Sequence, residues 1–542
     1  MLRAGTLRVQ PGTPVDTALS RLAETLASLH GWPRYGLAVL LGALMAAAMP
    51  PVDLSPVVFI SLPGLVWLDD GSEGGWSSFR LGYAFGMGFF IAGFYWMTAA
   101  LFVDIAQFWW ALPLALLGVP AILSFFTGVP MALLGLATRR FGLAGTARAC
   151  LFAVLWCAGE WARGHVLTGL PWNLVGYAWS GGFPGALALL QVTAWTGIYG
   201  LSFVTTLAAA TLALLGVPRR WPPSLRSTFG PVVAAAAILL LPAGFGALRL
   251  SKSPTRLGDT VLRLVQPSIP QSLKWDQTAG EENFHRLLEL SGTGGDRPPA
   301  AVIWPEGAAT FYLERDAKHR GEAAKVAPQG GYLITGAIRA DTAAGQPTRY
   351  YNSIEAIDGK GDIRATYDKS HLVPFGEYMP LRRLLPISDF IAGATDLSAG
   401  PGPRTISLPG LPPFAAAVCY EAIFPHAVVD ESNRPAWILN VTNDAWYGRT
   451  SGPYQHFAIA RTRAVEEGLP LVRVGNNGIS GVIDPEGRVV AHTTLDAIGY
   501  ADVTLPDPRG RTLYARAGDG VFAILLLLGL VPALWQARRR LR

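Results

Sequence analysis

The chain has 542 residues, which is long for a single domain, and 51% of them are hydrophobic whereas only 15% are charged. Water-soluble domains contain about 25% charged residues, so this composition excludes a purely water-soluble protein. The formal net charge of +6 does not indicate nucleic-acid binding, because the arginines cluster beside apolar segments, where membrane topology explains them. The apolar excess lies before about Leu250 and after Val521, which predicts a membrane bundle, one soluble domain and a final anchor.

The N-terminal residues 1–34 are polar and mildly basic, and they lack the apolar core of a cleaved signal peptide. We therefore expect the first hydrophobic segment to be retained. A membrane-spanning helix needs about 20 mostly apolar residues. The eight segments that we interpret as spans are Tyr35–Met49, Ser55–Leu68, Phe79–Val103, Phe108–Thr138, Thr146–Gly164, Pro184–Val217, Gly230–Leu250 and Gly520–Ala537. The first two are short, and the turn P-P-V-D-L-S-P between them predicts a tight hairpin.

These segments divide the chain into four parts. Residues 1–34 are a polar extension, 35–250 a bundle of seven spans, 251–515 a soluble domain, and 516–542 the last span with a basic tail.

The orientation in the membrane follows from the basic residues, because loops rich in Lys and Arg stay in the cytoplasm. The arginine clusters are Arg139, Arg140 and Arg148; Arg219, Arg220 and Arg226; and Arg538, Arg539, Arg540 and Arg542. With eight spans, the three clusters and the N-terminus share one side, so we expect cytoplasmic termini and a soluble domain on the opposite side.

Two features of the bundle carry polar or aromatic groups. Glu160 and Arg163 lie one helical turn apart, and ionisable residues in a membrane often mark functional sites. A self-satisfied ion pair near the helix end is the interpretation that we favour. The uncharged, aromatic loop Leu170–Ser180 predicts an interfacial belt or a re-entrant segment.

The soluble region alternates short apolar strands with helical stretches, which predicts one α/β domain. The expected strands are Val261–Gln266, Ala301–Trp304, Tyr332–Ala337, Tyr350–Ile357, Ile363–Tyr367, Phe414–Val418, Trp437–Val441, Leu471–Val474 and Ile479–Ile483. The segments D-G-K-G at 358–361 and D-P-E-G at 484–487 predict hairpin turns. Glu281–Leu290 and Gln455–Glu467 are expected to be helices.

One cysteine of the soluble region stands where an apolar strand stops. The stretch Ala415–Pro425 reads A-A-A-V-C-Y-E-A-I-F-P, and a strand that delivers Cys419 to a sharp turn exposes its sulfur at the rim of a sheet. The alternative is a core cysteine, because free cysteines are often buried. Cys150 and Cys157 lie seven apart in one apolar segment and are expected to be packing residues, so no disulfide framework is predicted.

Two further charged residues follow predicted strands. Glu306 comes directly after the strand in A-V-I-W-P-E-G, and Lys369 ends a hairpin strand in Y-D-K-S-H-L-V-P-F-G-E-Y-M-P, eight residues before Glu377. Each alone is more simply a solvated surface charge. Because strand ends converge on one rim of an α/β sheet, where ligands bind, a carboxylate, an ammonium and a thiol at three strand ends favour a catalytic site.

The segments W-P-E, Y-D-K and C-Y-E resemble the Glu-Lys-Cys signature of the nitrilase superfamily. The longer strings H-L-V-P-F-G-E-Y, C-Y-E-A-I-F-P, N-D-A-W-Y-G, G-P-Y-Q-H, A-R-T-R-A-V-E-E-G and N-N-G-I-S resemble one branch of it, the bacterial apolipoprotein N-acyltransferases. The resemblance covers the chain from about Tyr35. It implies eight spans around a nitrilase-like αββα sandwich, in the bacterial inner membrane with the catalytic domain on the periplasmic side.

The resemblance also implies roles for three residues: Cys419 as nucleophile, Glu306 as general base and Lys369 as the stabiliser of the oxyanion. The chemistry agrees with these roles. A thiol with a pKa near 8.5 is mostly protonated at pH 7 and needs a base beside it. Acyl transfer then develops negative charge on the carbonyl oxygen, which an ammonium and a backbone N–H at the turn after Cys419 stabilise.

Glu377 and Glu421 also match residues that the family requires. We interpret Glu377 as holding Lys369 or Glu306 in place, Glu421 as fixing the turn after Cys419, and Tyr420 as lining the acyl pocket. Trp275 matches a position near the substrate entrance, although ordinary aromatic packing explains it equally well. The loop Leu381–Thr395 mixes an arginine pair with apolar residues, and we expect it to be a lid that dips into the outer leaflet.

The implied reaction has two steps. Cys419 takes a fatty acyl chain from a phospholipid as a thioester, and the α-amine of a diacylglyceryl-cysteine at a lipoprotein N-terminus then receives it. No metal, soluble cofactor or nucleic acid is implied, and we expect a monomer. One alternative is a membrane-tethered amidase that passes its thioester to water. A second is a non-catalytic bundle whose nitrilase-like domain only binds a partner.

Overall fold

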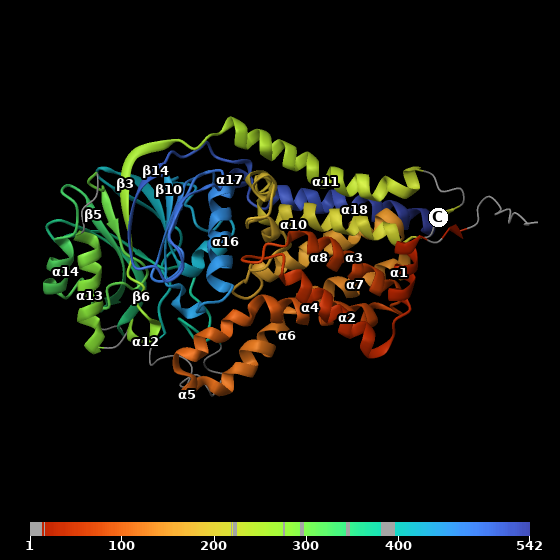
Figure 1. Ribbon diagram of the computed structural model, residues 1–542, viewed down its shortest axis with the longest axis horizontal. Coiled ribbons are helices and arrows are strands. Elements are labelled where there is room, and N and C mark those ends of the chain that lie inside the picture. Colours follow the sequence, from red (N-terminus) through yellow and green to blue (C-terminus); the bar gives the residue numbers. More distant parts are fainter. Residues whose placement is uncertain are drawn as a thin grey trace, which may run out of the picture.

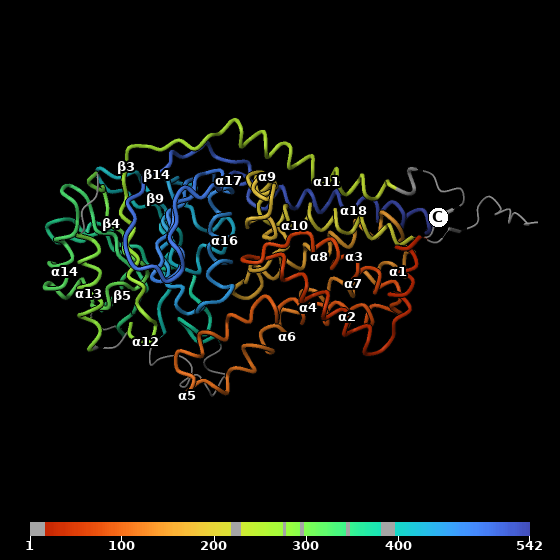
Figure 2. Tube along the Cα trace, in the orientation of Figure 1, coloured from red at the N-terminus to blue at the C-terminus, as the bar shows by residue number. Residues whose placement is uncertain are grey.

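The protein is elongated, with a helical bundle at one end and a soluble α/β domain at the other (Figure 1). The structure is a computed structural model, which describes residues 14–15, 17–217, 219–220, 225–274, 277–292, 297–342, 347–380 and 396–542. The chain enters the soluble domain after α11 (Leu225–Lys252) and returns to the bundle through α17 (Leu513–Ala517) and α18 (Gly520–Leu541) (Figure 2). Helix α1 (Ala18–Ala27) and the C-terminal end of α18 both lie at the end of the bundle away from that domain.

Two sheets of six strands form the soluble domain. The first has the order β14-β3-β4-β5-β6-β7, with bounds Gly499–Pro506, Leu257–Gln266, Ala301–Ile303, Tyr332–Asp341, Arg349–Asp358 and Ile363–Asp368. The second has the order β13-β12-β11-β10-β9-β8, with bounds Val489–His492, Gly481–Ile483, Leu471–Gly475, Trp437–Thr442, Leu411–Val418 and Thr405–Leu408. In the middle of each sheet three strands run parallel: β3, β4 and β5 in the first, and β9, β10 and β11 in the second.

The two sheets pack face to face and helices cover their outer faces. Leu264 and Ile334 of the first sheet share a core with Ala416 and Val474 of the second. On the outer face of the first sheet, Phe284 of α13 (Gln277–Gly292) packs in a separate apolar cluster, and α14 (Ala317–Ala324) lies on the same side. On the outer face of the second sheet lies α16 (Gly452–Glu467). The predicted αββα sandwich is therefore confirmed.

All nine predicted strands of this domain are present, as are its two predicted helices and both hairpin turns. Strands β8, β13 and β14 and the short helices α12 (Gln271–Lys274) and α14 were not predicted from the sequence. Strands β8 and β13 lie at the edges of the second sheet and β14 at an edge of the first. An edge strand is partly solvated and needs no continuous apolar run, so its sequence signal is weak. In β13, exposed and half-buried residues alternate.

The bundle contains helices in every segment that was predicted to span. Within the described residues, five are long and apolar enough to cross a membrane: Gly75–Ala111, Leu114–Phe141, Thr193–Gly216, Phe229–Lys252 and Gly520–Leu541. The other predicted spans correspond to α2 (Gly31–Ala46), α3 (Val58–Asp70) and α8 (Gly145–His165). The first two have 16 and 13 residues, and α8 carries three charged residues. The span count of eight stays a prediction.

Two long apolar segments are interrupted. In Pro184–Val217, helix α9 (Ala186–Leu190) is followed by α10 (Thr193–Leu212), which breaks at Gly197, where φ is 66° and ψ is 179°. In Phe108–Thr138, a π-helical turn (Leu114–Gly118) and α6 (Val119–Leu123) precede α7 (Phe125–Phe141). An arm projects from the bundle beside the soluble domain (Figure 1). It consists of the 3₁₀ helix η2 (Tyr95–Asp104), α5 (Ile105–Phe108), the π-helical turn and α6.

Glu160 and Arg163 do not form the ion pair that the sequence predicted. Arg163 instead donates to the carbonyl oxygen of Leu170 at 2.9 Å, and Glu160 accepts from the backbone N–H of Val175 at 2.9 Å. Both side chains thus hold the loop that follows α8. The interfacial belt predicted for this loop is also wrong, because residues 171–180 are all buried, and Trp172 donates to Gln455 of the soluble domain. The alternative, a re-entrant segment, stays a prediction. The buried backbone N–H and C=O groups of the loop need hydrogen-bond partners, and the side chains of Glu160 and Arg163 are among those partners.

Helix α16 contains a buried ion pair, and one member of this pair also bonds the bundle. Arg463 Nε lies 2.9 Å from Glu466 Oε2, and both side chains are at most 1% exposed. Glu466 also accepts a hydrogen bond of 2.8 Å from the backbone N–H of Ile198, next to the break in α10. The break leaves this N–H without a helical partner, and a carboxylate from the other domain supplies one.

We expect the substitution Arg463→Met to lower the free energy of unfolding by about 3–5 kcal/mol, because it leaves Glu466 buried without its counter-charge. The measurement is thermal unfolding of the purified protein in detergent. Arg449→Met is the matched control, since the Arg449 side chain is 84% exposed and its ion pair with Asp496 contributes little. Equal melting temperatures for the two variants would contradict the expectation.

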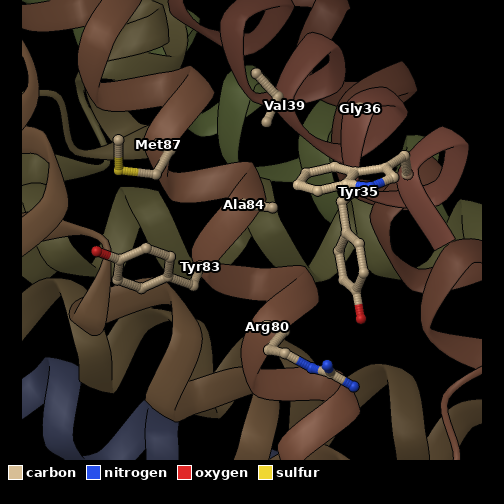
Figure 3. A pocket seen from close by; sticks show the side chains of 8 residues that line it. Tyr35, Gly36, Val39, Arg80, Tyr83, Ala84 and Met87 are labelled. Atoms are coloured by element: carbon tan, nitrogen blue, oxygen red, sulfur yellow. The ribbon is translucent and has the colours of Figure 1, made fainter.

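A groove of 370 Å³ opens on the side of the bundle between α2 and α4 (Gly75–Phe94) (Figure 3). Its walls are mostly apolar and aromatic, and Arg80 lies with its guanidinium carbon 5.7 Å from the ring centre of Tyr35. None of the predicted catalytic residues lines this groove. The candidate active site lies elsewhere, where the two domains meet.

Candidate active site

Cys419 follows β9 directly and begins the 3₁₀ helix η7 (Cys419–Ile423). Its φ of 50° is a left-handed conformation that is uncommon outside glycine. Residues held in such conformations cost about 1–3 kcal/mol and persist only where their surroundings fix them. Here Glu421 fixes the turn, because its Oε2 accepts a hydrogen bond of 2.7 Å from the backbone N–H of Val418. The result is a sharp strand-to-helix turn with the sulfur at its apex.

Glu421 also ties this turn to the segment after β7. Its Oε1 accepts from the hydroxyl of Tyr367 at 2.8 Å, from the backbone N–H of Ser370 at 2.7 Å and from that of His371 at 3.1 Å. The carboxylate is 4% exposed, so these bonds replace its hydration. The turn that carries Cys419 and the segment that carries Lys369 are therefore held together by one side chain.

Glu306 follows β4 at the carboxyl edge of the first sheet. Its Oε1 accepts a hydrogen bond of 2.7 Å from the side-chain amide of Asn352, and its Oε2 accepts one of 2.8 Å from the backbone N–H of Asn443, which follows β10. The carboxyl edges of both sheets thus meet at this carboxylate. Its side chain keeps 12% exposure.

Lys369 follows β7, and its side chain is 1% exposed. Its Nζ lies 2.9 Å from Glu377 Oε1 and 3.8 Å from Glu306 Oε1. Burial by itself would lower the pKa of Lys369, but the negative charges of Glu377 and Glu306 outweigh it and raise the pKa. Lys369 therefore carries a positive charge throughout the physiological pH range, flanked by two carboxylates.

Cys419 is buried, with 7% of the residue exposed. Burial and the negative charge of Glu306 raise the pKa of its thiol, the positive charge of Lys369 opposes them, and the net effect raises this pKa to about 12. The thiol therefore keeps its proton at neutral pH, and a reaction at this sulfur requires a base. Glu306 and Lys369 are close enough to the sulfur for their charges to affect it, so the structure brings all three predicted residues to one point.

The remaining predicted residues lie around this point or outside the described part. Glu377 contacts Lys369, and its Oε2 accepts from the backbone N–H of Val373 at 2.7 Å. Tyr420 donates its hydroxyl to the carbonyl oxygen of Gly169 at 3.0 Å, in the loop that follows α8. The site is therefore next to the bundle. Trp275 and the loop Leu381–Thr395 lie outside the described residues.

Two residues of this site, Asn352 and Lys274, were not predicted from the sequence. Asn352 donates to both Glu306 and Glu377, at 2.7 and 2.9 Å, and so links the two carboxylates. Lys274 donates from Nζ to the backbone carbonyl oxygen of Glu306 at 2.8 Å, and burial lowers its pKa to about 8. A buried asparagine in a predicted strand is a usable signal, because such an amide needs polar partners. Lys274 has no comparable signal in the sequence.

Two family models match the chain. The model described as apolipoprotein N-acyltransferase N-terminal domain matches residues 41–211, and the model described as carbon-nitrogen hydrolase matches residues 262–510. Among solved structures, an amidase of the nitrilase superfamily from Nesterenkonia AN1 is 18% identical and covers 49% of this chain and 95% of its own. Its TM-score is 0.35, too low to add to the assignment.

Curated relatives match over nearly their full length. An apolipoprotein N-acyltransferase from Rhodopseudomonas palustris is 41% identical over 542 residues, which cover 96% of this chain and 98% of that one. One from Bradyrhizobium diazoefficiens is 41% identical over 541 residues, with 96% and 98% covered. Such identity over both the bundle and the soluble domain shows that this chain belongs to the apolipoprotein N-acyltransferase family.

Proposed function

We propose that this protein transfers a fatty acyl chain from a membrane phospholipid to the N-terminal α-amine of the diacylglyceryl-cysteine of a lipoprotein. The transfer runs through a thioester on Cys419, with Glu306 as general base and Lys369 as oxyanion stabiliser. The observation that carries the proposal is the meeting of a protonated buried thiol, a carboxylate and a lysine at the junction of the soluble domain and the bundle. Membership of the family supports the choice of substrates.

The first step forms the thioester. Glu306 takes the proton of the Cys419 thiol as the sulfur attacks the carbonyl carbon of a phospholipid ester, and the oxyanion that forms is stabilised by Lys369. The carbon–oxygen ester bond then breaks. Glu306 returns the proton to the leaving alkoxide, so that the products are a lysophospholipid and an acylated Cys419.

The second step transfers the acyl group to the acceptor. The α-amine attacks the thioester carbonyl, the same stabilising groups receive the second oxyanion, and the carbon–sulfur bond breaks. The proton that the amine loses passes through Glu306 to the Cys419 sulfur, which restores the thiol. Both steps use Glu306 as the base and Lys369 as the group that stabilises the oxyanion.

Supporting groups have roles that follow from their contacts. Glu377 holds Lys369 and, through Asn352, Glu306. Glu421 holds the turn, and Tyr420, whose hydroxyl bonds the carbonyl oxygen of Gly169 in the bundle, is assigned to the acyl pocket. Trp275 lies outside the described residues, and its assignment to the substrate entrance rests on the family resemblance alone. The arm beside the soluble domain exposes Phe102, Trp109 and other apolar side chains, a surface suited to acyl chains.

The enzyme acts as a monomer, with residues 35–250 as the bundle and 251–515 as the catalytic domain.

The test of this function uses purified protein and phospholipid with a labelled acyl chain. We expect intact-mass spectrometry to show one acyl adduct, located on Cys419, and we expect added diacylglyceryl peptide to remove the adduct as the peptide gains the label. Turnover without any adduct would contradict the covalent step. Release of free fatty acid in place of acylated peptide would instead support the membrane-tethered amidase.

We further propose that the protein lies in the bacterial inner membrane with cytoplasmic termini and a periplasmic catalytic domain. The position of α1 and the end of α18 on the side of the bundle away from the soluble domain supports this topology. A membrane-impermeant maleimide should label the variant Lys360→Cys, in an exposed turn of the soluble domain, once the outer membrane is permeabilised. Arg542→Cys should be labelled only after lysis of the inner membrane, and the reverse pattern would refute the topology.

A further inference from the structure

The backbone carbonyl of Cys419 is held by two side chains that no part of the proposed reaction uses. His456 Nε2 lies 3.2 Å from this oxygen, and the side-chain amide of Asn440 donates to it at 3.4 Å. His456 belongs to α16 and Asn440 to β10, and both side chains are fully buried. Two buried donors on one carbonyl fix the orientation of the peptide that links Cys419 to Tyr420.

A second layer of buried groups fixes His456. Its Nδ1 lies 3.0 Å from Asp444 Oδ1 and 3.0 Å from Arg473 Nη2, and Arg473 forms an ion pair of 2.8 Å with Asp444. The partner of Nε2 is a carbonyl oxygen, so Nε2 must carry a proton. Burial and the charge of Arg473 lower the pKa of His456, whereas Asp444 raises it. Asp444 and Arg473 at Nδ1 and the carbonyl oxygen at Nε2 hold the ring in one orientation.

The consequence for the reaction follows from the geometry of the peptide bond. A peptide is planar and trans, so the N–H of Tyr420 points opposite to the carbonyl oxygen of Cys419. Since that oxygen faces His456 and Asn440, the N–H faces away from them. Tyr420 is the second residue of η7, where a backbone N–H has no acceptor within the helix. This donor is free to receive an oxyanion formed next to the sulfur.

We propose that His456, held by Asp444 and Arg473, is a positioning residue that aims the Tyr420 N–H at the oxyanion of the acyl-transfer reaction. The inference rests on the proposed function only in assigning acyl transfer to Cys419. His456 acts through the peptide and contacts no substrate. The Nε2–H of His456 is therefore needed for fast acylation of Cys419, whereas the thiol stays accessible to other reagents without it.

The experiment compares two reactions of Cys419 in the purified full-length protein. Acylation by p-nitrophenyl butyrate forms an oxyanion, whereas alkylation by iodoacetamide displaces iodide at a saturated carbon and forms none. We expect His456→Leu to slow acylation by about 10²–10³-fold, the effect of losing one oxyanion donor, with alkylation unchanged. We expect His456→Gln, which restores an N–H donor, to recover most of the rate. His492→Leu, at an exposed position of β13, is the matched control and should match the wild type.

Equal acylation rates for the wild type and His456→Leu would overturn the inference, and so would a parallel loss of alkylation, which indicates a distorted site. If His456→Leu does not accumulate as folded protein, His456→Phe carries the same expectation, since it keeps a ring beside Trp172 and Tyr447. Failure of the proposed function is seen separately, as a wild-type protein that acylates Cys419 but never transfers the group to a diacylglyceryl peptide.

Discussion

Replacing Cys419 by alanine is expected to abolish both the acyl adduct and the transfer of label to a diacylglyceryl peptide. Loss of a catalytic nucleophile costs several orders of magnitude, so we expect transfer to fall by at least about 10⁴-fold. The substitution removes one small buried side chain and leaves the bonds of Glu421 to Val418 and Tyr367 in place, so the fold should persist. Intact-mass spectrometry after incubation with labelled phospholipid measures the adduct, and thermal unfolding in detergent checks the fold.

The matched control is Cys150→Ala in the bundle, which removes a half-buried thiol far along the chain from the site. This variant should form the full adduct at the wild-type rate. An adduct that survives in Cys419→Ala, or one that disappears in Cys150→Ala, would show that another sulfur carries the acyl group.

Glu306→Gln is expected to change two properties of Cys419 in opposite directions. The variant lacks the base that takes the thiol proton, so we expect acyl transfer to fall by about 10²–10⁴-fold. The negative charge of Glu306 raises the pKa of Cys419. Removing that charge lowers this pKa, which increases the thiolate fraction at any pH below it. Alkylation by iodoacetamide at pH 8.5 should therefore be faster in the variant than in the wild type.

A general loss of structure would not produce this opposite response, which makes the pair of measurements specific for Glu306. Glu282→Gln is the control, because the Glu282 side chain is 80% exposed on α13. Its rates should equal those of the wild type. Acyl transfer at the wild-type rate in Glu306→Gln would exclude Glu306 as the base, and slower alkylation would contradict its effect on the thiol pKa.

The charged residues of the site were accessible from the sequence because each follows an apolar strand. Lys369 and Cys419 stand directly after β7 and β9, and Glu306 stands three residues after the end of β4; an apolar run marks where each strand stops. Asn352 and Arg473 lie within strands and His456 lies within a helix, so these three residues carry no such mark. They are scattered along the chain, and their partners include a backbone carbonyl and carboxylates that only folding brings near.

The bundle shows the same division. Apolar length located its helices, but the prediction of an ion pair between Glu160 and Arg163 rested on their spacing within one helix. In the structure the backbone of the buried loop after α8 binds both of them, and a loop without charged residues gives no sign of this in the sequence. Buried backbone groups are satisfied by whichever polar side chain lies nearest in space, and that is a tertiary property.

By itself the sequence determined the division into a membrane bundle and an α/β domain, nine of the twelve described strands of the sandwich, and the residue types that carry the chemistry. These depend on local apolar patterns, which secondary structure follows. The tertiary structure alone decided that the two sheets meet at Glu306, that Lys369 lies between two carboxylates, and that α16 presents His456 to the turn at Cys419. Those contacts join segments far apart in the chain, and only the packing of one sheet on the other, and of both on the bundle, sets their distances.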